Sequence, residues 1–130
     1  MNLRSRGQDE VARNMARIAK DIKPELVNLT RKAVLYVHST VPPYPAPPAG
    51  SSYRRTGTLG REIATEVRSL GADVVGVIGS KTIYAPYVID EKRQAWMHRG
   101  RWWTLQSVVS KARAVIVDIY VNGLRAIFRR

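Results

Sequence analysis

The stretch Arg61-Glu62-Ile63-Ala64-Thr65-Glu66-Val67-Arg68-Ser69 decides how the middle of this 130-residue chain folds. Uncharged side chains at positions 63, 65 and 67 alternate with mostly charged ones, which is typical of a strand with one buried face. A helix would instead place Glu62 and Glu66 at repelling positions four residues apart. Gly71-Ala72-Asp73 predicts a turn, and Val74 to Gly79 predicts a second strand that pairs with the first as a hairpin.

The segments on either side of this hairpin extend the expected sheet. Ile83 to Ile89 predicts a third strand. Pro86 places this strand at an edge, because proline cannot donate to a central ladder. Upstream, Arg54-Arg55-Thr56-Gly57-Thr58-Leu59 predicts a turn that starts the first strand, since glycine tolerates backbone angles that other residues avoid. Gly76 and Gly79 suggest a bulge or a close approach of another backbone. The sheet is expected to be small and antiparallel.

The N-terminal part shows helical periodicity on both sides of a proline. Apolar residues recur every three or four positions from Gln8 to Ile22, and again from Pro24 to about Thr40. Pro24 interrupts the pattern and suits the first turn of a new helix. We therefore expect two helices, or one broken helix. The apolar positions are Val11, Met15, Ile18 and Ile22 before the proline, and Leu26, Leu29, Ala33, Val34 and Val37 after it.

Five of the seven prolines lie in the stretch Val41-Pro42-Pro43-Tyr44-Pro45-Ala46-Pro47-Pro48-Ala49-Gly50-Ser51-Ser52. This stretch is expected to be extended and polyproline-like. Three interpretations stay open. It is a stiff loop between helix and sheet, an arm that docks across a neighbouring subunit, or a ligand for a small proline-recognising domain.

A long helix is expected from Leu105 to about Phe128. Thr104 can cap its start, and Trp103 can pack on Val108 as a hydrophobic staple. Several β-branched residues leave a strand in the middle of this segment as an alternative. The helix would be as long as a small domain is wide, so one end is expected to project or to pack on another subunit.

The chain is therefore predicted to form a single α+β domain over residues 1–130. Two N-terminal helices and a long C-terminal helix pack on a small antiparallel β-sheet, and a Pro-rich extended loop joins helix to sheet. The expected regions are a helical part (1–41), a Pro/Gly-rich arm and turn (42–60), antiparallel strands (61–89), an Arg/Trp loop (90–103) and a C-terminal helix (104–130).

Composition limits the possible partners. The chain has 22 basic and 10 acidic residues and a formal net charge of +12, which predicts attraction to nucleic acid or to an acidic protein surface. It has no cysteine, so disulfides and thiolate metal sites are excluded. No apolar run approaches the roughly 20 residues needed to span a bilayer, and the N-terminus lacks the apolar core of a signal peptide. We expect no membrane partner and synthesis inside the cell.

The residues give little support for catalysis, a metal or a cofactor. His38 and His98 are the only histidines, and no serine lies in a nucleophile elbow. Asp90, Glu91 and His98 are the only loose metal-ligand candidates, and the surrounding cations oppose a metal ion. We therefore expect neither an enzyme nor a cofactor.

The Arg/Trp loop has the composition of two kinds of surface. Tryptophan and arginine together suit a single-stranded nucleic-acid surface, and they are also common anchors of subunit interfaces. Composition alone leaves both interpretations open, and the family resemblance given below favours the interface. Arg54 and Arg55 could bind phosphate or acidic side chains of a neighbour. Arg125, Arg129 and Arg130 suit the negative end of a helix dipole.

Two short motifs carry a family resemblance: Thr56-Gly57-x-Leu59 and Tyr84-Ala85-x-Tyr87. In this order, a turn after an N-terminal helical part and then a strand before a C-terminal segment, they resemble the small head–tail joining and tail-completion proteins of long-tailed bacteriophages. The chain departs from that family after the second motif. Ile89-Asp90-Glu91-Lys92-Arg93 replaces an acidic residue, a spacer and Gly-Thr, and the tryptophan-rich segment from Trp96 to Trp103 replaces a Pro-Phe-Leu-like segment.

The resemblance implies a structural virion protein of the neck, made in the host cytoplasm. It implies a homo-oligomeric ring, six-fold or twelve-fold, with tail tube and portal or connector proteins as partners and packaged DNA as a nonspecific contact. A charge-driven nucleic-acid-binding protein is the alternative. The candidate contact residues are Tyr44, Arg54, Arg55, Tyr84, Tyr87, Trp96, Arg99, Arg101, Trp102 and Trp103, and the DNA-proximal candidates are Arg125, Arg129 and Arg130.

Overall fold

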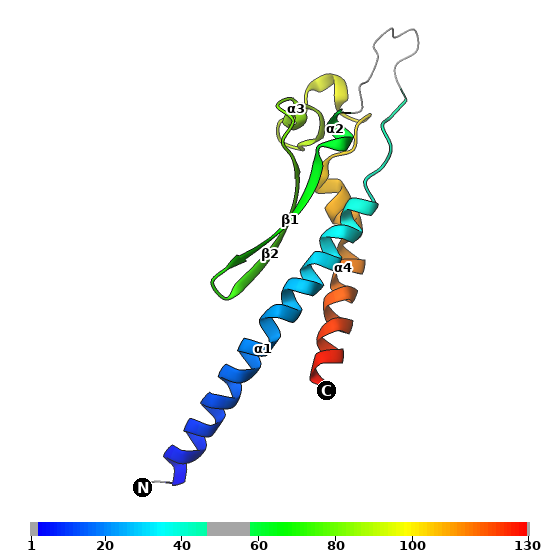
Figure 1. Cartoon of the computed structure of the whole chain (residues 1–130). Coiled ribbons are helices and arrows are strands. Elements are labelled where there is room, and N and C mark those ends of the chain that lie inside the picture. The colour runs from blue at the N-terminus through cyan, green and yellow to red at the C-terminus, as the bar shows by residue number, and fades with distance from the viewer. Residues whose placement is uncertain (1–2, 47–57, 130) are drawn as a thin grey trace.

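The structure, a computed structural model, describes residues 3–46 and 58–129. It combines two long helices with a two-stranded hairpin and several short helical turns. The elements are α1 (Leu3–Ser39), α2 (Thr58–Arg61), β1 (Ile63–Leu70), β2 (Asp73–Ser80), α3 (Ala85–Ile89), the 3-10 helix η1 (Trp96–His98) and α4 (Leu105–Phe128). The molecule is elongated, because α1 and α4 run side by side in opposite directions and α1 extends well past the end of α4 (Figure 1).

The hairpin confirms the two strands that the alternating pattern predicts. β1 and β2 pair in an antiparallel register from Ile63 opposite Ser80 to Leu70 opposite Asp73, without a bulge. Gly71 and Ala72 form the connecting turn, and Gly71 has a φ of 63°, in the left-handed region that favours glycine. Such a turn matches the right-handed twist of the two strands, so it closes the hairpin without splaying them.

One face of the hairpin packs against α1. Ile63 is buried on this face, while Thr65 and Val67 are half-buried. Gly76 lies opposite Val67, and a Cβ atom at Gly76 would collide with the side chain of Val34 in α1. The predicted close approach is found at Gly76 as packing against the side chains of Val34 and Thr30, which lie nearer than any backbone atom of α1. It is wrong at the second glycine of the strand, Gly79, where a Cβ atom would meet nothing within 4 Å.

The expectation of two N-terminal helices is not confirmed, because α1 is a single helix that contains Pro24. Pro24 is exposed, and its missing N–H and its ring cost the helix about 3 kcal/mol. The turns that follow pack on the rest of the fold, with Leu26 and Leu29 half-buried and Thr30 buried. Burial of this face offsets the cost of the proline, so the helix continues through it.

The prediction of a third strand over residues 83–89 is wrong. Residues Ala85–Ile89 form the short helix α3, and the sheet of the described residues has two strands. Pro86 lies in the first turn, where its missing N–H removes no intrahelical hydrogen bond. Ala85, Val88 and Ile89 are buried, and their three- and four-residue spacing is that of a helix face.

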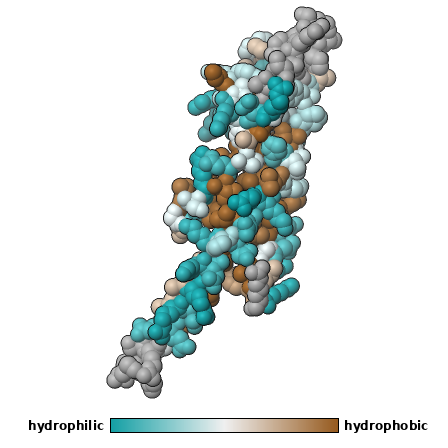
Figure 2. Space-filling model, viewed as in Figure 1, coloured by the Kyte–Doolittle hydropathy of each residue, from teal (hydrophilic) through white to brown (hydrophobic). Residues whose placement is uncertain are grey.

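The core consists of two connected clusters. One gathers Leu59, Ala85, Val88 and Ile89, and the other gathers Val37, Val108 and Ala112. Trp103 packs against both clusters, so it joins the α3 end of the molecule to the α1–α4 pair. Figure 2 shows apolar side chains at the middle of the visible face, where the hairpin lies over the long helices.

The helix α4 confirms the prediction for the C-terminal segment, and no strand interrupts it. Thr104 and Ser107 form a capping box in which each side chain accepts a hydrogen bond from the other residue's N–H. The expected contact of Trp103 with the cluster that contains Val108 is also present. Along its length α4 touches α1, where the hydroxyls of Thr30 and Tyr120 are 2.6 Å apart.

Candidate functional site

The Arg/Trp loop is held from inside by a glutamine. Gln94 is buried, and its Nε2 donates hydrogen bonds to the carbonyl oxygens of Val88 at 2.7 Å and Trp102 at 3.3 Å. The N–H of Ala95 donates to the carbonyl of Tyr87 at 2.8 Å. These bonds fix the loop to α3. Sequence reasoning missed Gln94, because a single amide in a charged segment looks like a surface residue.

Two of the three tryptophans pack against the core. Trp102 and Trp103 are half-buried, and the ring of Trp102 lies 5.1 Å from that of Tyr44, centroid to centroid. The indole N–H of Trp103 donates to the carbonyl of Pro43 at 3.3 Å. Arg101 donates to the carbonyl of Ala46 at 3.2 Å. Four of the predicted contact residues therefore fasten the first part of the Pro-rich stretch to the loop.

The same stretch is also tied to the short helix before β1. The N–H of Gly60 in α2 donates a hydrogen bond to the hydroxyl of Tyr44. Thr58–Arg61 is a single helical turn that leads into β1, whereas most of the turn predicted over residues 54–59 is not described by the structure. Arg54, Arg55, Thr56 and Gly57 lie outside the described residues.

The other aromatic residues of this region are exposed, as are Ile83 and Met97 beside them in the sequence. They form an exposed patch, here named the aromatic cap, which consists of Ile83, Tyr84, Tyr87, Trp96 and Met97. Trp96 is 81% exposed and Ile83 is 92% exposed. The bond between Ala95 and Tyr87 places η1 directly beside α3, so the two halves of the cap are neighbours. Large apolar side chains that gather on a surface mark a site of interaction.

Cationic side chains border the cap. Lys92, Arg93 and Arg99 are exposed, and the Nε of Arg99 donates to the carbonyl of Gln94 at 3.4 Å. Asp90 is engaged internally, because its Oδ1 accepts hydrogen bonds from the N–H of Lys92 and from Nε2 of Gln106. The surface can therefore offer aromatic faces and positive charge together, which suits an acidic protein surface or a nucleic acid.

The predicted metal-ligand candidates do not gather at one place in the part of the chain that the structure describes. Among the described residues, no three or more His, Asp or Glu side chains gather in a way that could hold a metal ion. Nε2 of His38 lies 3.2 Å from the carbonyl oxygen of Ile63. His98 stands edge-on to Trp102, with ring centroids 6.1 Å apart. Each histidine therefore has a local contact within the described residues.

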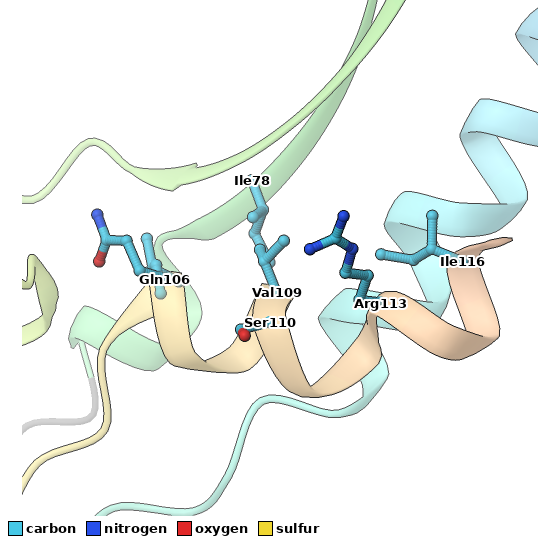
Figure 3. Close-up of a pocket in the computed structure, with 7 residues that line it drawn as sticks. Ile78, Gln106, Val109, Ser110, Arg113 and Ile116 are labelled. Carbon is cyan, nitrogen blue, oxygen red and sulfur yellow. The ribbon is translucent and has the colours of Figure 1, made fainter.

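An open pocket of about 600 Å³ lies between β2 and one face of α4 (Figure 3). Gln106, Val109 and Arg113 project from α4 into it, and Ile78 reaches down from the hairpin toward Val109. Its lining is mostly apolar and contains no carboxylate and no histidine. One cation in an apolar groove can hold a docked side chain, but it supplies no acid–base pair. The lining residues are Ile78, Leu105, Gln106, Val109, Ser110, Arg113 and Ile116.

The predicted DNA-proximal residues lie far from the cap. Arg125 and Arg129 are exposed at the end of α4, and the N–H of Arg129 donates to the carbonyl of Arg125 at 3.2 Å. Arg130 lies outside the described residues. The aromatic cap and this basic end are therefore separate surfaces at opposite ends of α4 (Figure 1).

Comparisons of the chain with protein-family models, with curated proteins and with solved structures find no match. Its function is therefore inferred from its own residues and contacts. Within the described residues, no helix combines the length and the apolar character that a membrane crossing requires.

Proposed function

We propose that this protein is a structural virion component at the junction between the head and the tail of a bacteriophage. Copies form a ring, six-fold or twelve-fold, that completes or terminates the tail or links the tail tube to the portal or connector. The observation that carries the proposal is the placing of the Tyr84-Ala85-x-Tyr87 motif. Ala85 is buried in the core, while Tyr84 and Tyr87 are exposed in the aromatic cap.

In this position the motif both anchors α3 in the core and presents aromatic side chains to a partner. Ala85 and Val88 anchor α3 in the core, so the tyrosines stand on a rigid element. Exposed Tyr and Trp side chains supply large contact areas at a low cost in conformational entropy, and such residues dominate the energetics of interfaces. The bordering Lys92, Arg93 and Arg99 favour a partner surface that carries acidic groups.

A charge-driven nucleic-acid-binding protein is the second candidate. The observation in its favour is the exposed ring of Trp96 between Arg93 and Arg99, which can stack on a base while the cations meet phosphates. This function predicts tight binding by the monomer. It also predicts an affinity that falls steeply as salt rises, because phosphate contacts release counterions.

Quantitative mass spectrometry of gradient-purified particles from the source tests the first proposal. A copy number near six or twelve relative to the portal is expected. Particles assembled with Trp96→Ala are expected to lose the chain, because the substitution removes the most exposed aromatic ring of the cap. Leu35→Ala is the matched control, since Leu35 is an exposed apolar residue of α1 outside the cap, and its particles are expected to keep the chain.

Absence of the wild-type chain from particles with intact tails would overturn the structural role. Tight, salt-sensitive DNA binding by the purified monomer, reduced by Trp96→Ala, would then support the second candidate. Equal incorporation of Trp96→Ala and wild type would instead show that the cap is not the contact surface.

A further inference from the structure

The helix α1 carries one apolar stripe along most of its length, and only part of the stripe is covered. Its members follow one another at steps of three or four residues: Val11, Met15, Ile18, Ile22, Leu26, Leu29, Ala33 and Val37. Ala33 and Val37 are buried against the rest of the fold. Val11 is 57% and Met15 is 64% exposed. A helix with an apolar face normally buries that face against another element.

The uncovered part continues the internal interface between the two long helices. The side chain of Leu29 fills the space at Gly123, near the end of α4. Because α4 runs in the opposite direction to α1, it ends beside the middle of α1, and the first half of α1 projects alone (Figure 1). Val11, Met15, Ile18 and Ile22, here named the projecting stripe, therefore prolong the face that α4 covers farther along.

A second apolar stripe lies on α4. It consists of Val117, Val121, Leu124 and Phe128, here named the outer stripe, and its spacing of four, three and four residues equals that of the projecting stripe. Val117 and Phe128 are exposed, whereas Val108 and Ala112 on the other side of the helix are buried. The two stripes therefore match in length and in period, and each has three exposed members and one half-buried member, Ile22 in the first and Leu124 in the second.

We propose that the projecting stripe of one copy docks on the outer stripe of α4 in a second copy of this chain. One such contact covers both stripes at once, whereas pairing of two α1 helices would leave the outer stripe in water. The contact joins two different surfaces, so it is heterologous and can be repeated from copy to copy until a ring closes. The inference deepens the proposed function and rests on it for this ring geometry.

The ring also sets the direction of the helices. Neighbours in a ring of six or more copies are rotated by a sixth of a turn or less, so their α4 helices run in similar directions. The α1 of one copy then lies antiparallel to the α4 of the next, as it does to its own α4 (Figure 1). This direction pairs Val11 with Phe128, Ile18 with Val121 and Ile22 with Val117.

Disulfide cross-linking of the full-length chain tests this contact, because the natural chain has no cysteine. Chains with Ile18→Cys are mixed with chains that carry Val121→Cys, and the mixture is oxidised. A cross-linked dimer is expected, since paired stripe positions bring their Cβ atoms close enough for a disulfide. A chain with both substitutions is expected to give a ladder of higher oligomers. Lys20→Cys mixed with Val121→Cys is the control, because Lys20 lies on the opposite side of α1 from the stripe.

Three results would overturn the inference. Cross-linking of Ile18→Cys chains with one another would show that α1 pairs with α1. Equal yields from the Ile18 and Lys20 mixtures would show nonspecific collision. No product in any mixture would show that the stripes do not cover each other. A specific ladder from a chain that is absent from particles would keep this contact and reject the phage function. Incorporation into particles without specific cross-linking would keep the phage function and reject this contact.

Discussion

The two halves of α1 have the same pattern and different surroundings. In the C-terminal half the apolar stripe meets α4 and the hairpin, and Val37 is 4% exposed. In the N-terminal half the stripe continues without a break in period, yet Val11 is 57% exposed. Identical periodicity therefore leads to burial only where the chain supplies a second element. We propose that the uncovered half takes part in an interaction outside the single chain, and the following substitutions test this division.

The largest effect is expected when the same charge is placed in each half of the stripe. Val37→Asp puts an unpaired carboxylate among Val108, Ala112 and Trp103, and it should cost more than about 4 kcal/mol of the free energy of unfolding. Val11→Asp meets water and should change that free energy by less than about 0.5 kcal/mol. Urea unfolding followed by circular dichroism measures both values.

The matched pair decides whether the halves differ. A similar loss of unfolding free energy in Val37→Asp and Val11→Asp would show that Val11 is already covered in the isolated chain. Val11→Asp should instead abolish self-association while leaving the fold intact, which sedimentation of the same sample detects.

A smaller effect is expected where the hairpin covers α1. Gly76→Ala places a Cβ atom against Val34, whose β-branched side chain cannot rotate away in a helix, and should cost about 1 to 3 kcal/mol. Gly79→Ala on the same strand meets open space and should be neutral or stabilising by up to about 1 kcal/mol. Thermal unfolding of the two variants measures the difference. Equal stability would mean that the hairpin does not press on α1 at Gly76.

Removal of one hydroxyl between α1 and α4 should have a still smaller effect. Thr30 is 2% exposed, and Tyr120→Phe leaves its hydroxyl without the partner that lies 2.6 Å away. A loss of about 1 kcal/mol is expected in chemical unfolding. Tyr87→Phe, at an exposed position of the cap, should leave stability unchanged. A loss of stability in Tyr87→Phe as large as in Tyr120→Phe would contradict the assignment of Tyr120 to the contact between α1 and α4 and of Tyr87 to the surface.

The smallest effect is expected at the outer face of the hairpin. Arg68 donates a hydrogen bond to Glu66 at 2.9 Å, and this bond and the positive charge lower the pKa of the Glu66 carboxyl. A lowered pKa in the folded state stabilises the fold above the ordinary glutamate pKa of about 4.3, and this contribution disappears as the pH falls through the lowered value. Both side chains are more than half exposed, so solvent and salt screen the pair.

At low salt, the unfolding midpoint of Glu66→Gln should therefore fall slightly less between neutral and acidic pH than the midpoint of the wild type. High salt should remove the difference. Arg68→Gln should behave like Glu66→Gln, and a midpoint that differs between them at neutral pH would show that the residues act separately.

The sequence predicted the elements whose signals are local. Alternation from Ile63 to Val67 gave both the strand and its buried face, and Gly71 marked the turn. The cap at Thr104 and the apolar spacing from Leu105 onward placed the start and the length of α4. In each case the signal depends on the backbone period or on a hydrogen bond within a few residues.

The errors occurred where tertiary contacts decide between two local options. Pro86 suits an edge strand and the first turn of a helix equally well, and burial of Ala85, Val88 and Ile89 selects the helix. Pro24 is a break in an isolated helix, but packing of the following turns keeps α1 continuous. Tertiary contacts also decided which tryptophans of the candidate site are accessible, because Trp102 and Trp103 are half-buried while Trp96 is exposed.

By itself, then, the sequence determined the periods of the chain: the strand alternation, the stripes of α1 and α4, the caps and the excess of positive charge. Only the tertiary structure decided which side chains are covered. The physical reason is that a period follows from backbone geometry within a few residues, whereas burial depends on where another element begins and ends. Because α4 ends beside the middle of α1, one half of a continuous stripe is core and the other half is surface.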